Sequence, residues 1–267
     1  MVAALIELRG AGVRIGQRTI LDAVDLSVAT GEVVGLLGPN GSGKTTVARA
    51  CLGLLPLQSG AALLQGRAAG SLRPAERARI VAYLPQQRGA AWPIAVRDAV
   101  ALGRFAYGTA LGKLAPADEA AVDRAIHDCA LEALTDRAVT SLSGGEAARV
   151  HVARALAAQT PALIADEPIA ALDPLHQWGV MRVLAGYGAT GGGALVVLHD
   201  IAMAAQFCTR IILMKAGRVI ASGPPAQTLT AAALREAYGI EAELVSDGGR
   251  LLFGIGGPAG MADGAGA

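Results

Sequence analysis

The sequence predicts an α/β fold in which a mostly parallel sheet is flanked by helices, with an antiparallel β subdomain before it and a helical subdomain inserted into it. Three observations support this prediction. A glycine-rich stretch, residues 38–46, lies between a short apolar run and a helical segment. Strand and helix patterns alternate again from residue 162 onward. Between these two regions, residues 88–140 show helical periodicity and loops but no strand pattern.

The N-terminal part predicts strands. Alternating patterns cover residues 5–9, 12–15, 19–21 and 24–28, with a turn at Gly16-Gln17. We expect these segments to form an antiparallel sheet ahead of a buried strand at 33–37. A helix at 46–55, a strand at 61–64, a helix that begins near Pro74 and a strand at 80–84 follow.

The remainder alternates helices and strands. Helices are predicted at 96–102, 117–134, 147–158, 174–187 and 201–208, strands at 162–165 and 195–198, and a hairpin at 211–221 around Ala216-Gly217. We assign residues 1–241 to one domain. Its core comprises 1–87 and 160–225, its helical subdomain 88–159 and its terminal helix 226–241. Residues 242–267 are assigned to a tail, disordered from residue 259, where glycine and alanine dominate.

Composition narrows the class of protein. The 267 residues carry a net charge of +1, so there is no electrostatic footprint of a nucleic-acid-binding protein. The three cysteines, Cys51, Cys129 and Cys208, are far apart and lack metal-ligand spacing, which indicates buried free thiols in a reducing compartment. The N-terminus has Glu7 and no signal-peptide pattern, and no stretch approaches about 20 predominantly apolar residues. We therefore expect a soluble chain in the cytoplasm.

The glycine-rich stretch at residues 38–46 is the first candidate for a functional site. It matches the pattern G-x-x-x-x-G-K-[ST], with the residues Gly38, Pro39, Asn40, Gly41, Ser42, Gly43, Lys44, Thr45 and Thr46. Its glycines allow backbone N–H groups to curl around phosphate oxygens, and the following helix N-terminus adds positive potential. Lys44 is then expected to reach the β- and γ-phosphates, and the Thr45 hydroxyl to hold Mg²⁺. The alternative is a glycine turn before an ordinary helix, but the strand before the loop and the helix after it favour a nucleotide site.

A second glycine-rich stretch, Leu142-Ser143-Gly144-Gly145-Glu146, has two interpretations. Ser143 and Glu146 have the spacing of a capping box, which most proteins of this size contain. A capping box does not explain the two glycines. They expose backbone N–H groups beside a helix N-terminus, which makes a second candidate anion site.

Carboxylates and a histidine follow two predicted strands. Asp166 and Glu167 stand at the carboxyl end of the strand at 162–165, which is the edge where ligands bind in such sheets. Asp166 suits Mg²⁺ coordination, and Glu167 suits polarising the attacking water as a general base. Taken alone, such a pair is more often a loop or a helix cap. His199, at the end of another strand, is either a core histidine or a contact to the γ-phosphate.

In order and spacing, these motifs resemble those of the ATP-binding cassette (ABC) ATPases over residues 5–238. The resemblance implies that residues 38–46 are the Walker A loop and that Walker B ends at Glu167. It implies that Gln86 contacts Mg²⁺ and the attacking water, that Asp173 is the D-loop aspartate and that His199 is the H-loop switch. The signature motif would be Ser143, Gly144, Gly145 and Glu146. ATP is then the substrate and Mg²⁺ the cofactor.

The resemblance also implies partners. Ser143 and Gly145 of one copy would close over the γ-phosphate held by a second copy, and hydrolysis would open this homodimer. Because the chain has no predicted membrane span, transport implies separate permease subunits, with this subunit on the cytoplasmic face of the cell membrane and a substrate-binding protein outside. Trp92 and Ile94 are candidates for the permease contact, and ordinary packing of the helical subdomain is the alternative.

Four segments, 71–79, 83–86, 99–104 and 165–177, resemble the ATPases of ferric-siderophore, haem and cobalamin importers. We therefore expect a subunit that energises uptake of one of these compounds. The alternatives are an ATPase of a zinc/manganese, lipid or exporter system, or a soluble ABC protein of nucleic-acid or iron–sulfur metabolism. His176 invites a metal-binding interpretation, but we expect it on an exposed helix turn.

Two positions depart from the family pattern. Ile15 stands where the family has an aromatic residue that stacks on adenine; because such stacking contributes roughly 1–3 kcal/mol, we expect weaker adenine binding. Ile169 stands where the family usually has threonine after Asp-Glu-Pro. We expect no effect on catalysis there, because this position does not contact phosphate.

Overall fold

The computed structural model describes residues 4–86, 93–109, 112–247 and 250–258 of the chain. Its centre is a six-stranded sheet in the order β10-β9-β3-β8-β7-β6. The strands are β3 (Val33–Leu37), β6 (Val81–Leu84), β7 (Ala162–Asp166), β8 (Gly193–Val197), β9 (Arg210–Lys215) and β10 (Arg218–Gly223). Neighbouring strands are parallel except in the β9–β10 hairpin. Val33 and Leu37 pack into one core cluster and Val34 and Leu36 into the other, so both faces of β3 are buried.

A second, antiparallel sheet has the order β2-β1-β4-β5, with β1 (Ala4–Ile15), β2 (Arg18–Ala29), β4 (Ser59–Leu64) and β5 (Arg67–Ala68). The four short strands expected before residue 29 are two continuous ones. The pattern breaks because the register shifts within the β1–β2 pair and because Gly10 and Ala23 adopt positive φ, while the pairing itself continues. Helix α1 (Lys44–Cys51) contacts strands of both sheets.

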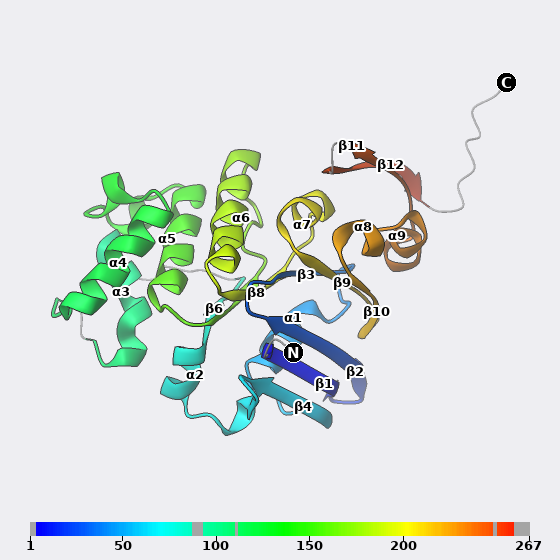
Figure 1. Ribbon diagram of the computed structural model, residues 1–267, viewed down its shortest axis with the longest axis horizontal. Helices are drawn as coiled ribbons and strands as arrows, with labels where there is room; N and C mark the ends of the chain where they lie inside the picture. Colours follow the sequence, from blue (N-terminus) through cyan, green and yellow to red (C-terminus); the bar gives the residue numbers. More distant parts are fainter. Residues whose placement is uncertain (1–3, 87–92, 110–111, 248–249, 259–267) are drawn as a thin grey trace.

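The other helices lie around the central sheet, and α3 (Val96–Ala101), α4 (Pro116–Asp128) and α5 (Gly144–Ala157) stand together at the left of the view in Figure 1. These three helices pack against one another as the expected helical block. Buried Arg104, in the 3₁₀ helix Leu102–Tyr107, donates to Asp118 at 2.7 Å and to the carbonyl of Ala157, which ties this block together. Helix α2 (Pro74–Ile80) precedes β6, whereas α6 (Pro174–Ala189) follows β7 and α7 (Ile201–Phe207) follows β8.

The C-terminal part differs from the expectation. The predicted terminal helix is two helices, α8 (Pro225–Thr228) and α9 (Ala231–Tyr238), because Thr230 caps a new helix and Gly239, at φ +70°, ends it. The expected tail forms an antiparallel hairpin, β11 (Ile240–Asp247) and β12 (Arg250–Pro258), and β12 lies against α7. Residues 259–267, where disorder is expected, lie outside the described residues.

Two predictions from composition are addressed by the structure. Cys51, Cys129 and Cys208 are buried free thiols, as expected. Burial raises the pKa of Cys129 and Cys208 to about 12, so these thiols stay protonated near neutral pH. Within the described part of the chain, no helix combines the length and the apolar character that crossing a bilayer requires.

Candidate functional site

The phosphate loop connects β3 to α1 at the carboxyl edge of the sheet. Its backbone needs glycine at two places. A Cβ atom at Gly38 (φ +152°) would lie 2.4 Å from the carbonyl oxygen of Met214, and one at Gly43 (φ +101°) would lie 2.8 Å from the Leu21 side chain. The loop therefore passes close to β9 and β2, and only glycine allows this path.

Lys44 is buried within this loop. Its Nζ donates hydrogen bonds to the carbonyl oxygens of Gly38 at 2.6 Å and Pro39 at 3.1 Å. Burial lowers the pKa of Lys44, while the carboxylates of Glu167 and Asp166 act in the opposite direction. The ammonium group is thus held inside the loop next to two acidic residues, where a phosphate oxygen could replace the carbonyls.

Asp166 and Thr45 form a pair that fits a divalent cation. The Thr45 hydroxyl donates to Asp166 Oδ1 at 3.3 Å, whereas buried Oδ2 accepts no hydrogen bond from the described residues. Burial raises the pKa of Asp166, although the Thr45 hydroxyl opposes this shift. A buried carboxylate oxygen without a partner, beside a hydroxyl oxygen, is the donor set that Mg²⁺ uses next to nucleotide phosphates.

Glu167 is held by two groups from neighbouring strands. Its Oε1 lies 2.6 Å from Nε2 of His199, which follows β8, and its Oε2 accepts from Nε2 of Gln86 at 2.7 Å, just after β6. Glu167 adopts φ +53°, a conformation that non-glycine residues rarely take, and its N–H donates to Val197 at 3.1 Å. A strained backbone at such a position is typical of functional sites. The structure thus brings together three side chains that lie far apart in the sequence.

Lys44, Thr45, Glu167 and His199 line a cavity of about 400 Å³, whereas Gln86 and Asp166 are not among its lining residues. The lining side chains and loop atoms come from Arg18, Thr19, Ile20, Asn40, Gly41, Gly43, Lys44, Thr45, Thr46, Glu167, His199, Ala216 and Gly217. Ile15 pairs with Arg18 across the β1–β2 turn and exposes 60% of its surface. Ile15 is not among the lining residues of the cavity, and its contact to adenine stays a prediction.

The second glycine-rich stretch begins α5. Ser143 caps this helix: its Oγ accepts from the Glu146 N–H at 3.3 Å, and a Glu146 carboxylate oxygen accepts from the Ser143 N–H at 2.8 Å. The capping-box interpretation is therefore confirmed. None of Ser143, Gly144, Gly145 and Glu146 lines the cavity, and α5 stands with α3 and α4 on the opposite side of α6 from α1 (Figure 1). One copy of the chain does not bring the two candidate anion sites together.

The remaining predicted residues are placed as follows. Asp173 caps α6 by accepting from the His176 N–H at 3.0 Å, and its other oxygen lies 2.6 Å from His176 Nδ1. The side chain of His176 is only partly exposed, at 29%. Ile169 is buried in the core, as expected for a position without a phosphate contact. Ile94 is half-buried and packs against the core, and Trp92 lies outside the described residues.

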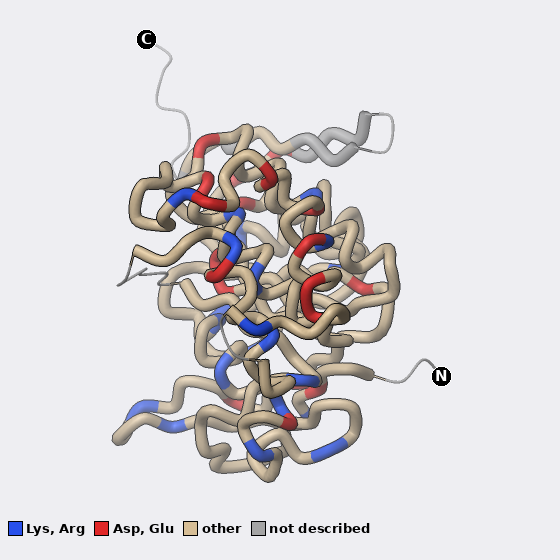
Figure 2. Tube along the Cα trace, turned by 90° about the vertical axis from the view of Figure 1, so that its left-hand side faces the viewer, with Lys and Arg blue, Asp and Glu red and all other residues tan. Residues whose placement is uncertain are grey.

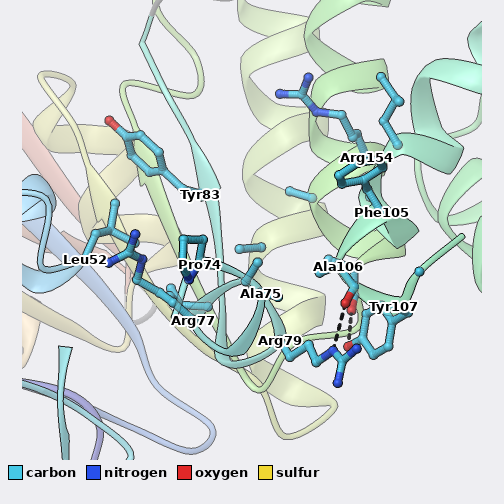
Figure 3. Close-up of a pocket in the computed structure, with 18 of the residues that line it drawn as sticks. Leu52, Pro74, Ala75, Arg77, Arg79, Tyr83, Phe105, Ala106, Tyr107 and Arg154 are labelled. Atoms are coloured by element: carbon cyan, nitrogen blue, oxygen red, sulfur yellow. Dashed lines mark hydrogen bonds between the residues drawn. The ribbon is translucent and has the colours of Figure 1, made fainter. Parts of the chain in front are cut away.

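A groove that sequence reasoning missed runs between α2, the 3₁₀ helix Leu102–Tyr107, β6 and α5 (Figure 3). It has a volume of about 870 Å³, and its apolar lining includes Leu54, Leu102 and Phe105. Phe105 exposes 75% of its surface. The charged residues that line the groove are Arg77, Arg79 and Arg154, and the described lining includes no acidic residue. The sequence offered no signal, because helical periodicity does not show which apolar residues a fold leaves uncovered.

Known proteins resemble this chain over most of its length. A family model described as ABC transporter matches residues 21–170. The hemin import ATP-binding protein HmuV of Streptomyces coelicolor is 40% identical over 229 residues, which cover 86% of this chain and 81% of that protein.

Two solved structures have the same fold. A chain of an ABC transporter in an inward-facing conformation has a TM-score of 0.80 at 20% identity and covers 94% of this chain and 96% of its own. The ATP-binding cassette MJ0796, in a dimeric post-hydrolysis structure bound to ADP and Pi, has a TM-score of 0.71 at 26% identity. The match covers 82% of this chain and 98% of the MJ0796 chain. The predicted fold class is confirmed by these similarities.

Proposed function

This chain belongs to the ABC transporter family of ATPases, and from that membership we propose that it drives haem import by hydrolysing ATP for separate permease subunits. The observation that carries the choice of haem is the similarity, over most of the chain, to proteins named for hemin import. Ferric-siderophore and cobalamin uptake are the competing substrates of the same class of importer. In this role the subunit works on the cytoplasmic face of the cell membrane.

The geometry of the cavity supports a separate role for each site residue in ATP hydrolysis. Lys44 would exchange the carbonyl oxygens of its own loop for oxygens of the β- and γ-phosphates. Glu167 would take the proton from the attacking water, because its carboxylate is oriented on both oxygens by His199 and Gln86. Thr45 and Asp166 would hold Mg²⁺. Gln86, the third predicted Mg²⁺ contact, donates to Glu167 in the structure. The cation would neutralise charge that develops on the phosphates.

The cavity becomes complete in a homodimer. The N-terminus of α5 offers backbone N–H groups and the Ser143 hydroxyl, but it does not line the cavity of its own chain. A head-to-tail pair would place this helix end over the γ-phosphate of the second copy. ATP then joins the copies, and loss of the γ-phosphate releases them. Asp173, at the start of α6, would lie in the same interface.

The groove at Phe105 suits a cytoplasmic segment of the permease. The exposed apolar residues of its lining favour an apolar partner, and its arginines favour a negatively charged one. Burial lowers the pKa of Arg154, so a carboxylate brought by a partner would stabilise its charge. Figure 2 shows Lys and Arg prevailing at the lower end of the molecule in that view, where Asp and Glu are sparse. We therefore expect the permease segment to present apolar side chains and at least one Asp or Glu.

Reconstitution tests this function. The chain is co-expressed with the permease and substrate-binding protein whose genes adjoin its own, and the complex is placed in proteoliposomes. We expect ATP-dependent accumulation of haem, and none with the Glu167→Gln variant. Uptake of a ferric siderophore or cobalamin in place of haem would correct the substrate, and export would overturn the importer assignment. Failure to co-purify with any permease would favour a soluble ABC protein.

A further inference from the structure

His176 connects two segments that the proposed dimer uses. Its backbone N–H and its ring Nδ1 contact the two carboxylate oxygens of Asp173, at 3.0 Å and 2.6 Å. Its ring also lies against the first turn of α5. A Cβ atom built at Gly145 would be 2.3 Å from Cδ2 and 2.7 Å from Nε2 of this ring. His176 therefore touches both the D-loop aspartate and the signature helix of the same chain.

The two signature glycines differ in this respect. A Cβ atom at Gly144 would meet nothing within 4 Å, whereas one at Gly145 would overlap the imidazole ring. Gly145 thus allows the ring to approach the helix backbone, in addition to exposing its N–H group. Any larger residue at 145 would require the imidazole ring to move from this place.

Helix capping alone does not explain the histidine. The cap of α6 needs only an acceptor for the His176 N–H, which Asp173 Oδ1 provides. The second contact, between Asp173 Oδ2 and the ring, is not part of the cap. A metal site does not explain it either, because no three His, Cys, Asp or Glu side chains in the described residues are grouped to hold an ion.

We propose that His176 is a positioning residue that fixes the D-loop aspartate to the signature helix, so that Asp173 and Gly145 reach the second copy as one rigid unit. This inference rests on the proposed dimer. Two surfaces held in fixed relation lose less conformational freedom on association than two that move separately, so the ring should strengthen dimerisation without changing how one copy binds ATP.

The test uses the full chain in the Glu167→Gln background, where ATP is bound but not hydrolysed. Dimerisation with Mg-ATP is measured by sedimentation, and nucleotide affinity of the monomer by titration with a fluorescent ATP analogue. We expect His176→Ala to weaken dimerisation by about fivefold or more, within the usual range of coupling between sites, and to leave monomer affinity unchanged. His176→Gln, whose amide can donate to Asp173, should recover most of the dimerisation.

A matched control is available on α4. His127 Nδ1 lies 2.8 Å from Glu132 Oε1, a similar histidine–carboxylate pair in which the histidine side chain is 80% exposed. His127→Ala should leave dimerisation unchanged. Equal dimerisation of His176→Ala and its parent would overturn the positioning role, and so would a loss that Gln does not rescue. If the parent itself does not dimerise with ATP, the proposed function fails instead, and the two failures are thereby distinguished.

Discussion

The carboxylate of Glu167 lies 2.6 Å from Nε2 of His199, and this pair joins the ends of β7 and β8 at the floor of the nucleotide cavity. Gln86 binds the other carboxylate oxygen. Both carboxylate oxygens of Glu167 are therefore held by side chains of the protein. In the proposed mechanism, ATP and the second copy of the chain complete the site around this base.

We expect Glu167→Gln to abolish hydrolysis and retain ATP binding. The amide keeps the shape of the side chain but cannot accept the proton from water, so kcat should fall by about 100-fold or more. ATP turnover and ATP affinity are measured side by side. Glu119→Gln, an exposed change on α4, is the control and should behave as wild type. Substantial turnover by Glu167→Gln would exclude this residue as the base.

We expect Asp166→Asn to stabilise the nucleotide-free protein while it abolishes Mg²⁺-dependent hydrolysis. Asp166 is 1% exposed, and its Oδ2 has no hydrogen-bond partner among the described residues. Asn keeps the size of the side chain but carries no charge, so it removes the cost of burying an ionised carboxylate, and the melting temperature should rise by about 2 °C or more at neutral pH. Calorimetry without Mg²⁺ and nucleotide measures this change.

The same variant gives a pH dependence. Burial raises the pKa of Asp166 above its unfolded value, so on acidification the native carboxyl is protonated before the unfolded one. The destabilisation that ionised Asp166 causes is therefore complete above the raised native pKa. It disappears as the pH falls toward the pKa of the unfolded state, about 3.9. The gain in melting temperature from Asp166→Asn should therefore shrink over this pH interval. An advantage that grows on acidification would contradict the assignment.

We expect Ile15→Tyr to tighten ATP binding. A stacked aromatic ring contributes roughly 1–3 kcal/mol more than an aliphatic contact, which corresponds to at least about fivefold in affinity. Titration with ATP and with a triphosphate that lacks the adenine base separates the contribution of the base. Leu54→Tyr, at an exposed position outside the cavity, is the control. Unchanged or weaker affinity of Ile15→Tyr would refute the adenine contact.

We expect Phe105→Glu to uncouple transport from hydrolysis. The change places a charge among the apolar residues of the groove, where the permease would bury an aromatic anchor, so uptake should fall by about tenfold or more. ATP hydrolysis by the isolated subunit should stay unchanged. Phe105→Leu keeps an apolar contact and should retain most of the uptake. Normal co-purification and uptake with Phe105→Glu would place the permease elsewhere.

Much of the fold could be predicted because its signals are local. The buried strand β3, the glycine loop and the capped helices α5 and α6 each depend on a few neighbouring residues. The continuous strands β1 and β2 were harder to predict, because bulges break the alternation that defines a strand. The β11–β12 hairpin was not predicted, although Ile240, Ala242 and Leu244 alternate with glutamates as in a strand.

The candidate site could be predicted in its parts but not in its contacts. Motif spacing named Lys44, Glu167 and His199, yet the hydrogen bonds of Glu167 depend on the order of strands in the sheet. The ring of His176 against Gly145 and the groove at Phe105 depend on how helices pack, which local patterns do not specify. The roles of the site residues remain predictions that the variants above can test.

Cross-linking between single-cysteine variants tests the central claim, that each nucleotide lies between the phosphate loop of one copy and the start of α5 in the other. Asn40→Cys and Ser143→Cys are made separately in the Glu167→Gln background; the three native cysteines are buried and should not interfere. With Mg-ATP and an oxidant, a mixture of the two variants should give a covalent dimer, and neither variant alone should do so. A mixture that binds ATP but forms no covalent dimer would contradict the account.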